Sequence, residues 1–125
     1  MIVDSSALMA ILAEEPGAAA LARRLLAEPS RRMSAGTLVE TLIVAEAGGV
    51  VDDLTALLEE VGIEIIPVDA AQAALALDGF RRFGKGRHPA GLNYGDLFAY
   101  ALARAEDEPL LFVGNDFART DLRVA

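Results

Sequence analysis

Four acidic residues that are far apart in the chain have settings from which a carboxylate can do chemistry. Asp4 and Asp116 each come at the end of a short apolar run, and Glu40 and Asp96 lie among largely apolar residues with helical spacing. Carboxylates that crowd together repel one another, and protonation or a divalent cation relieves the repulsion. The chain has no Cys and one His. Oxygen ligands and a hard cation, Mg²⁺ or Mn²⁺ rather than Zn²⁺, are therefore the expected chemistry.

Each of these acids also has an ordinary structural role open to it. Asp4 is placed to cap the helix that follows it, and Asp96 to complement a helix dipole, which contributes about 0.3–1 kcal/mol. Glu40 is compatible with an exposed helical position and Asp116 with a turn. The apolar neighbours of Glu40 and Asp96 favour a functional role, because a solvated acid does not need them. Asp121, five residues beyond Asp116, is a further candidate ligand.

The order of predicted elements is the one that would bring these acids together. Strands are predicted at residues 1–3, 63–68 and 110–113, with a very short strand at 31–33. Helices are predicted over 18–27, 52–61 and 94–105, and others begin after Ser5, Ser34 and Asp69. Parallel strands need helical crossovers, so the order predicts an α/β protein with a parallel sheet between helical layers. Strand ends and the following helix starts then lie on one rim of the sheet, where open α/β sheets bind ligands.

Composition and length limit the class of protein. The 125 residues suit a single domain over residues 1–125, and no apolar run approaches the roughly 20 residues of a membrane span. A cytoplasmic protein with no membrane contact is expected. The net charge of −8 argues against a protein that holds nucleic acid by bulk electrostatics, unless metal ions neutralise the site.

The basic residues are concentrated in one part of the chain. Four of them fall within seven positions, directly before His88: Arg81, Arg82, Lys85 and Arg87. A phosphate-facing patch and a solvated helix end followed by a loop both explain this cluster.

Four segments of the sequence together resemble a known family. They are Ile2-Val3-Asp4-Ser5-Ser6-Ala7-Leu8, Ser34-Ala35-Gly36-Thr37-Leu38-Val39-Glu40, Leu92 to Ala103, and Leu110 to Phe117. They span the chain and are similar to PIN-domain ribonucleases, more narrowly to the VapC toxins of type II VapBC toxin–antitoxin systems. The resemblance implies a PIN-like three-layer α/β/α domain with a central, mainly parallel sheet.

The resemblance also implies roles for individual residues. The family's acidic catalytic positions fall on Asp4, Glu40, Asp96 and Asp116. Ser6 falls on a position where a hydroxyl commonly supports the site. Because the family's last acidic position varies, Asp121 remains an alternative to Asp116.

The activity that follows is that of a Mg²⁺-dependent endoribonuclease, in which Mn²⁺ would substitute. One or two ions would be held by Asp4, Asp96 and Asp116, and would orient a water and polarise the scissile phosphate. Glu40 would complete the set of ligands or accept the proton of the water. Single-stranded or looped RNA is the expected substrate, because its backbone can enter a narrow acidic cleft.

Binding partners are implied as well. Arg82, Lys85 and Arg87 would contact the RNA and offset the negative charge of the cleft. The resemblance implies a VapB-type antitoxin in a groove between the N-terminal helices. A homodimer is also expected. Apolar residues of these helices, such as Leu8 and Leu54, fit such a groove, a dimer face or plain core packing.

Two other classes of protein gather acids on the rim of a parallel sheet. A receiver-like phosphoaspartate protein would need a suitably placed Lys, and the only Lys is Lys85 in a predicted loop. A haloacid-type phosphatase would need an Asp at the position of Ser6. A non-catalytic binding module is the alternative that is not an enzyme.

Overall fold

A parallel sheet forms the centre of the protein, with strand order β3-β2-β1-β4. The computed structural model describes residues 1–125. Its strands are β1 (Ile2–Val3), β2 (Arg32–Ser34), β3 (Glu64–Ile66) and β4 (Leu110–Leu111). All the pairings between neighbouring strands are parallel, so the carboxyl ends of the strands share one edge of the sheet. The predicted parallel α/β architecture is confirmed.

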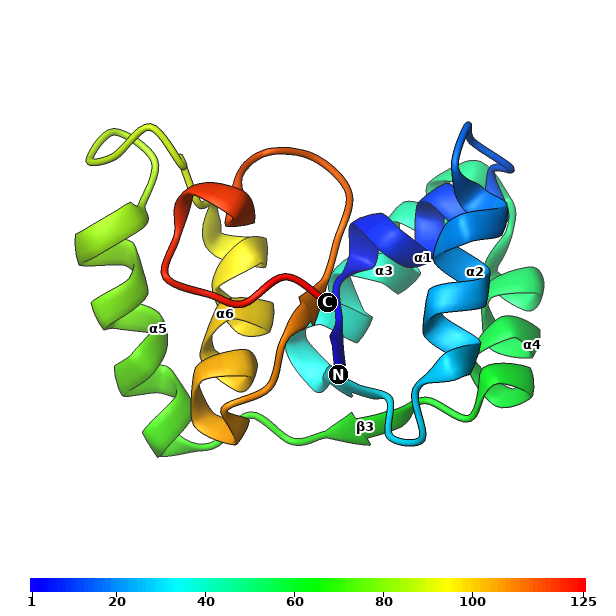
Figure 1. Ribbon diagram of the computed structural model, residues 1–125, viewed down its shortest axis with the longest axis horizontal. Helices are drawn as coiled ribbons and strands as arrows, with labels where there is room; N and C mark the ends of the chain where they lie inside the picture. Colours follow the sequence, from blue (N-terminus) through cyan, green and yellow to red (C-terminus); the bar gives the residue numbers. More distant parts are fainter.

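Helices cover both faces of this sheet. They are α1 (Ser5–Leu12), α2 (Ala18–Ala27), α3 (Ala35–Gly48), α4 (Val51–Val61), α5 (Ala70–Phe83) and α6 (Tyr94–Glu106). Figure 1 shows α5 and α6 on one side of the strands and α1, α2 and α4 on the other. Helix α3 contacts helices of both groups, α6 on one side and α1 and α4 on the other. None of the helices is both long and apolar enough to cross a membrane.

The strand residues alternate between two hydrophobic cores. Ile2 and Leu110 are fully buried among residues of α6, including Tyr100. Their neighbours Val3 and Leu111 point to the opposite face, where they join the core formed with α1 to α4. This alternation is the two-residue period of a strand covered on both faces. It fixes the register that brings the end of β1 beside the end of β4.

The structure corrects the importance that the sequence assigned to the strand at residues 31–33. Residues 31–33 were expected to be a minor strand, but β2 is an interior strand that pairs with both β1 and β3. Its weak signal comes from Arg32, whose guanidinium reaches Glu106 at 2.6 Å and Glu108 at 2.9 Å. The other strands are shorter than predicted, and α1 begins one residue earlier, at Ser5, because Asp4 caps it.

The C-terminal segment was not predicted to have regular structure. It forms a short 3₁₀ helix, η1 (Phe117–Arg119), and then runs along the outer edge of β4. The Leu110 N–H donates to the Arg123 carbonyl at 2.9 Å, and the Ala125 N–H donates to the Leu110 carbonyl at 2.9 Å. The edge of the sheet is therefore covered, and the segment after β4 is held at both of its ends.

Candidate active site

Asp4 lies at the carboxyl end of β1, where the chain enters α1. It is 4% exposed, and its Oδ2 accepts hydrogen bonds from the Ser6 N–H at 3.0 Å and the Ser6 hydroxyl at 2.7 Å. Its other oxygen, Oδ1, is buried and has no partner. Burial raises the pKa of Asp4, and the Ser6 hydrogen bonds only partly oppose this. Asp4 is thus a helix cap with one oxygen left free, which a cap alone does not require.

Ser6 ties the ends of two strands together. While its hydroxyl donates to Asp4, the same oxygen accepts a hydrogen bond from the Val113 N–H at 3.0 Å. Val113 lies just beyond β4, so this contact joins the segment that leads to Asp116 to the start of α1. The supporting position predicted for Ser6 therefore has a structural basis, although a sequence cannot show its backbone partner.

Asp96 lies in the first turn of α6 and is held by a reciprocal cap. The Asn93 N–H donates to Asp96 Oδ2 at 3.0 Å, and the Asp96 N–H donates to Asn93 Oδ1 at 3.0 Å. Burial raises the pKa of Asp96 to about 6; the Asn93 hydrogen bond opposes this, and the charges of Asp4 and Asp116 add to it. Asp96 therefore does stabilise the start of α6, but its carboxylate is also repelled by other acids.

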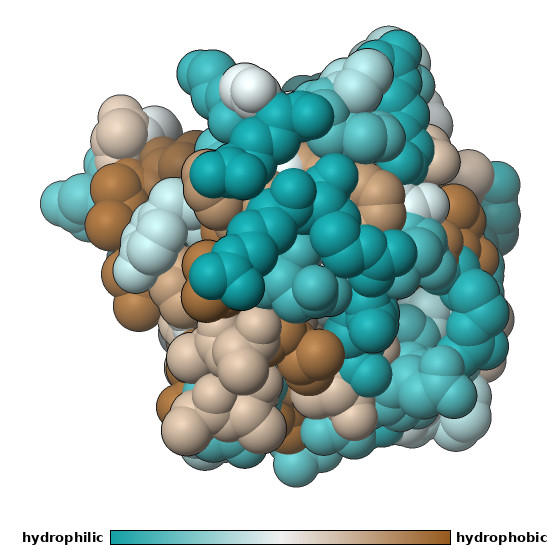
Figure 2. Space-filling model, turned by 90° about the vertical axis from the view of Figure 1, so that its left-hand side faces the viewer, coloured by the Kyte–Doolittle hydropathy of each residue, from teal (hydrophilic) through white to brown (hydrophobic).

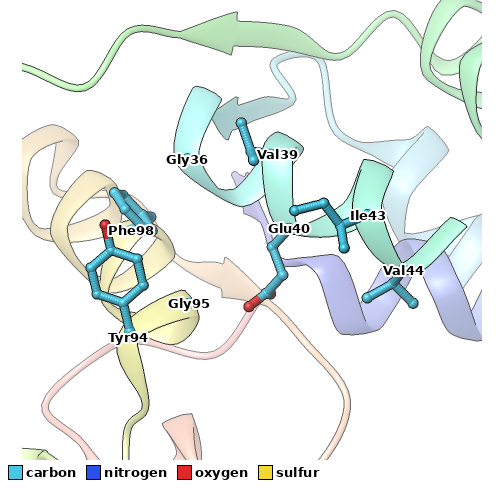
Figure 3. Close-up of a pocket in the computed structure, with 8 residues that line it drawn as sticks. All are labelled: Gly36, Val39, Glu40, Ile43, Val44, Tyr94, Gly95 and Phe98. Carbon is cyan, nitrogen blue, oxygen red and sulfur yellow. The ribbon is translucent and has the colours of Figure 1, made fainter. Parts of the chain in front are cut away.

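Glu40 extends from the second turn of α3 toward the start of α6. Its carboxylate rests against Gly95, so closely that a Cβ at that position would overlap its Oε2. Figure 3 shows Glu40 directed at the turn that carries Gly95. Burial raises the pKa of Glu40, and the charges of Asp4 and Asp96 raise it further. Sequence reasoning missed Gly95, although a glycine in the first turn of an otherwise apolar helix is a signal of close approach.

Asp116 and Asp121 belong to different clusters. Asp116 directly precedes η1, forms no side-chain cap and contributes negative charge at Asp96. Both oxygens of Asp121 are instead occupied, by Tyr100 and by two arginines on the α5 and α6 side. The acids that interact through their charges are therefore Asp4, Glu40, Asp96 and Asp116.

This set of acids fits a hard divalent cation. It offers only oxygen donors, burial and the charges of neighbouring acids raise the pKa of Glu40 and of Asp96, and a buried oxygen of Asp4 lacks any protein donor. As the side chains lie, no three His, Asp or Glu groups already form a metal-ligand arrangement. A bound cation would offset the repulsion among the carboxylates and allow them to lie closer together.

An apolar groove of about 460 Å³ opens beside the acids, between α3 and α6. Its apolar walls come from Val39, Ile43 and Val44 on one side and from Tyr94 and Phe98 on the other, and Glu40 lies between them (Figure 3). The groove therefore reaches the acidic site directly.

The basic residues predicted to contact RNA differ in their surroundings. The Arg82 guanidinium is 3.2 Å from an oxygen of Asp121 and stacks over Phe83, so its charge is already paired. Arg87 lies over the ring of Phe80. Lys85 forms no ion pair and lines a groove with Asn93, next to the cap of Asp96.

The raised pKa values predict an unusual dependence of stability on pH. Because the folded protein binds protons at Asp96, Asp4 and Glu40 more tightly than the unfolded chain, stability should fall as pH rises from about 4 toward 6 and above. Glu108, whose pKa is lowered from 4.5, opposes this only at lower pH. In chelator, the Tm should thus be higher at pH 5 than at pH 7.5, and Mn²⁺ should raise it mainly at pH 7.5. Thermal melts that give a lower Tm at pH 5 would contradict the burial of these acids and the charge that surrounds Glu40 and Asp96.

Comparison with known proteins identifies the family to which this protein belongs. A model of the PIN domain matches residues 1–122. The chain therefore belongs to the PIN-domain family.

Curated relatives narrow the assignment. A ribonuclease VapC of Mycolicibacterium smegmatis is 46% identical over 98% of this chain and 97% of the relative. Ribonuclease VapC42 of Mycobacterium tuberculosis is 45% identical over 100% of this chain and 98% of the relative. The expectation of a VapC-type ribonuclease is confirmed, and neither the receiver-like nor the non-catalytic alternative is supported.

Solved structures agree on the fold. Mycobacterium tuberculosis VapC20, a toxin that cleaves the sarcin-ricin loop, superposes with a TM-score of 0.77 over 99% of this chain and 97% of that one, at 17% identity. A toxin–antitoxin complex from Klebsiella pneumoniae gives a TM-score of 0.76 over 99% and 95% of the two chains, at 18% identity. These likenesses support the PIN-like α/β architecture.

Proposed function

We propose that the four acids form the active site at which this ribonuclease cleaves RNA. Its cofactor would be Mg²⁺, for which Mn²⁺ can substitute. The observation that carries the proposal is the free, buried Oδ1 of Asp4, together with Glu40 and Asp96, whose pKa values are raised by burial and by the charges of neighbouring acids. Such a set is unfavourable in the free protein and becomes favourable when a cation joins it. The arrangement of these acids therefore favours the binding of a positively charged ligand.

Each acid has its own part in the reaction. Asp4, Asp96 and Asp116 hold the cation, which when bound polarises a phosphodiester and makes a water more acidic. Ser6 and Asn93 keep Asp4 and Asp96 in place through the hydrogen bonds described above. Glu40 accepts no hydrogen bond from the protein and has a raised pKa, so it is suited to take the proton of the attacking water. Attack of that water on the phosphorus would break the bond to the 3′ oxygen, which would take up a proton from solvent, so the products would be a 5′-phosphate and a 3′-hydroxyl.

The substrate is a single-stranded or looped segment of RNA. A flexible backbone can pass between α3 and α6 to reach the acids, whereas a rigid duplex presents its phosphates on a convex surface. Among the basic residues, Lys85 is the best placed to offset the charge of the RNA near Asp96, because no carboxylate pairs with it. Arg87 and, where its ion pairs open, Arg82 would act further along the strand.

The protein acts as the toxin of a VapBC pair in the cytoplasm. Of the apolar residues of the N-terminal helices, Leu8 and Leu54 are fully buried and serve the core. Ile11 and Leu57 instead line a small groove between α1, α2 and α4, where an apolar segment of a VapB-type antitoxin would bind. Known structures of similar fold include a toxin–antitoxin complex and a VapBC2 of Rickettsia felis bound to a promoter DNA fragment. A homodimer is proposed as well, with a contact face that leaves the groove between α3 and α6 open to RNA.

An RNA cleavage assay tests this function. Purified protein should cut total RNA in Mg²⁺ or Mn²⁺, and chelator should stop the reaction. Asp96→Asn should lower the rate at least about a hundredfold, because the polarisation supplied by a metal is worth several kcal/mol. The amide oxygen of Asn can still accept the Asn93 hydrogen bond, so the helix cap survives. Cleavage that continues in chelator, or at the full rate in the variant, would rule out the proposed mechanism.

A further inference from the structure

Asp121 is the centre of a polar cluster that lies apart from the acids. Its Oδ1 accepts a hydrogen bond from the Tyr100 hydroxyl at 2.9 Å, and its Oδ2 is 2.9 Å from Arg104 Nη1 and 3.2 Å from Arg82 Nη1. Arg104 also donates to the Tyr100 hydroxyl at 2.8 Å. The four residues thus link the C-terminal segment to both α5 and α6.

Tyr100 gives this cluster a rigid base. This residue of α6 is fully buried in the core, and its ring packs so closely on Gly79 of α5 that a Cβ there would overlap it. This close packing restricts the ring and therefore the position of its hydroxyl. Figure 2 views the molecule from the α5 side and shows hydrophilic residues gathered over the middle of that face.

The segment that the cluster holds is the one that carries Asp116. From Val113 to Asp116 the chain is exposed. It is anchored before this stretch by the Val113–Ser6 hydrogen bond, and after it by the buried Phe117 and then by Asp121. Thr120 closes the turn between these two anchors by donating to the Phe117 carbonyl at 2.7 Å. Asp116 has no side-chain bond of its own to hold it at a helix cap.

We infer that Asp121 is a positioning residue, which acts through Tyr100 and Arg104 to hold the backbone of Asp116 where that acid can bind the cation. The inference rests on the proposed function. Both carboxylate oxygens of Asp121 are already hydrogen-bonded, so Asp121 is not free to be a ligand itself. Without the cluster, Asp116 would sample more positions, and cation binding would have to overcome the lost order.

Calorimetric titration with Mn²⁺ separates positioning from direct ligation. Asp121→Asn and Tyr100→Phe should each weaken Mn²⁺ binding by roughly three- to tenfold, less than the 10–100-fold typical of direct partners of ligands. Asp121→Asn places an amide N–H₂ against the arginines, and Tyr100→Phe removes the hydrogen bond to the other oxygen, so both changes loosen the same cluster. The double variant should therefore lose less affinity than the two single losses combined. Tyr100→Phe keeps the buried ring and leaves the Asp121 carboxylate intact, so it tests the link without altering a potential ligand.

Asp107→Asn is the matched control. It makes the same chemical change in a second ion pair of the C-terminal segment, 3.2 Å from Arg123, with a side chain that is 97% exposed. Mn²⁺ affinity should be unchanged in this variant. Unchanged affinity in Tyr100→Phe, or an equal loss in Asp107→Asn, would overturn the inference. Asp96→Asn separates the positioning role of Asp121 from the proposed function. If this variant binds Mn²⁺ like the wild type, the proposed function fails as well.

Discussion

Asp4→Asn should lower RNA cleavage at least about a hundredfold while making the metal-free protein more stable at pH 7.5. Activity falls because an amide is a poor ligand for Mg²⁺. Stability rises because Asn caps a helix as well as Asp does, and because a buried charge without a partner on Oδ1 is removed. Cleavage rates and thermal melts in chelator, on the same preparations, measure the two effects.

The matched control for this change is Asp69→Asn. Asp69 caps α5, where its Oδ1 accepts a hydrogen bond from the Gln72 N–H at 2.8 Å. It should keep the activity of the wild type. A lower Tm for Asp4→Asn in chelator would show that Asp4 is mainly a stabilising cap, and full activity would remove it from the site.

Gly95→Ala should lower activity roughly ten- to a hundredfold with little change in stability, since a shift of about 1 Å at a catalytic group can cost a hundredfold. The new Cβ would occupy the space of Glu40 Oε2, so the carboxylate must move. That carboxylate is the far end of a flexible side chain, and Ala favours a helix over Gly by about 1 kcal/mol, so folding should not suffer. The variant therefore displaces Glu40 without removing it.

Gly48→Ala provides the comparison. Gly48 is also helical, in α3, but the nearest atom to its added Cβ is 3.8 Å away. This variant should gain stability and keep its activity. Equal activity in the two variants would mean that the position of Glu40 does not matter for the reaction.

The sequence predicted most of the fold because its signals were local. The helices predicted to begin after Ser34, Asp69 and Asn93 all form, with these residues as their caps. A short polar side chain directly before an apolar run with helical spacing is typical of a helix start. The interior position of β2 could not be predicted, because Arg32 is neutralised by Glu106 and Glu108, which lie more than 70 residues away. The path of the C-terminal segment along β4 depends on backbone pairing, which leaves no side-chain pattern.

The sequence was enough to choose candidate acids and to name Ser6 as a support, but it did not reveal the contacts that hold them. Asp4, Glu40, Asp96 and Asp116 could be chosen because strand ends and helix starts of a parallel sheet share a rim. The bond from the Val113 N–H to Ser6, and the fit of Glu40 on Gly95, join residues that are distant in sequence. Asp121 could not be separated from Asp116 by sequence, because only the fold shows that Tyr100 and Arg104 occupy its oxygens.

Calorimetric titration of the metal-free protein with Mn²⁺ at pH 7.5 tests most directly whether the four acids form a cation site. The wild type should bind Mn²⁺ with a measurable heat, and Asp4→Asn should show none under the same conditions. A wild type that does not bind, or an Asp4→Asn variant that binds equally tightly, would contradict the assignment of these carboxylates to one metal centre.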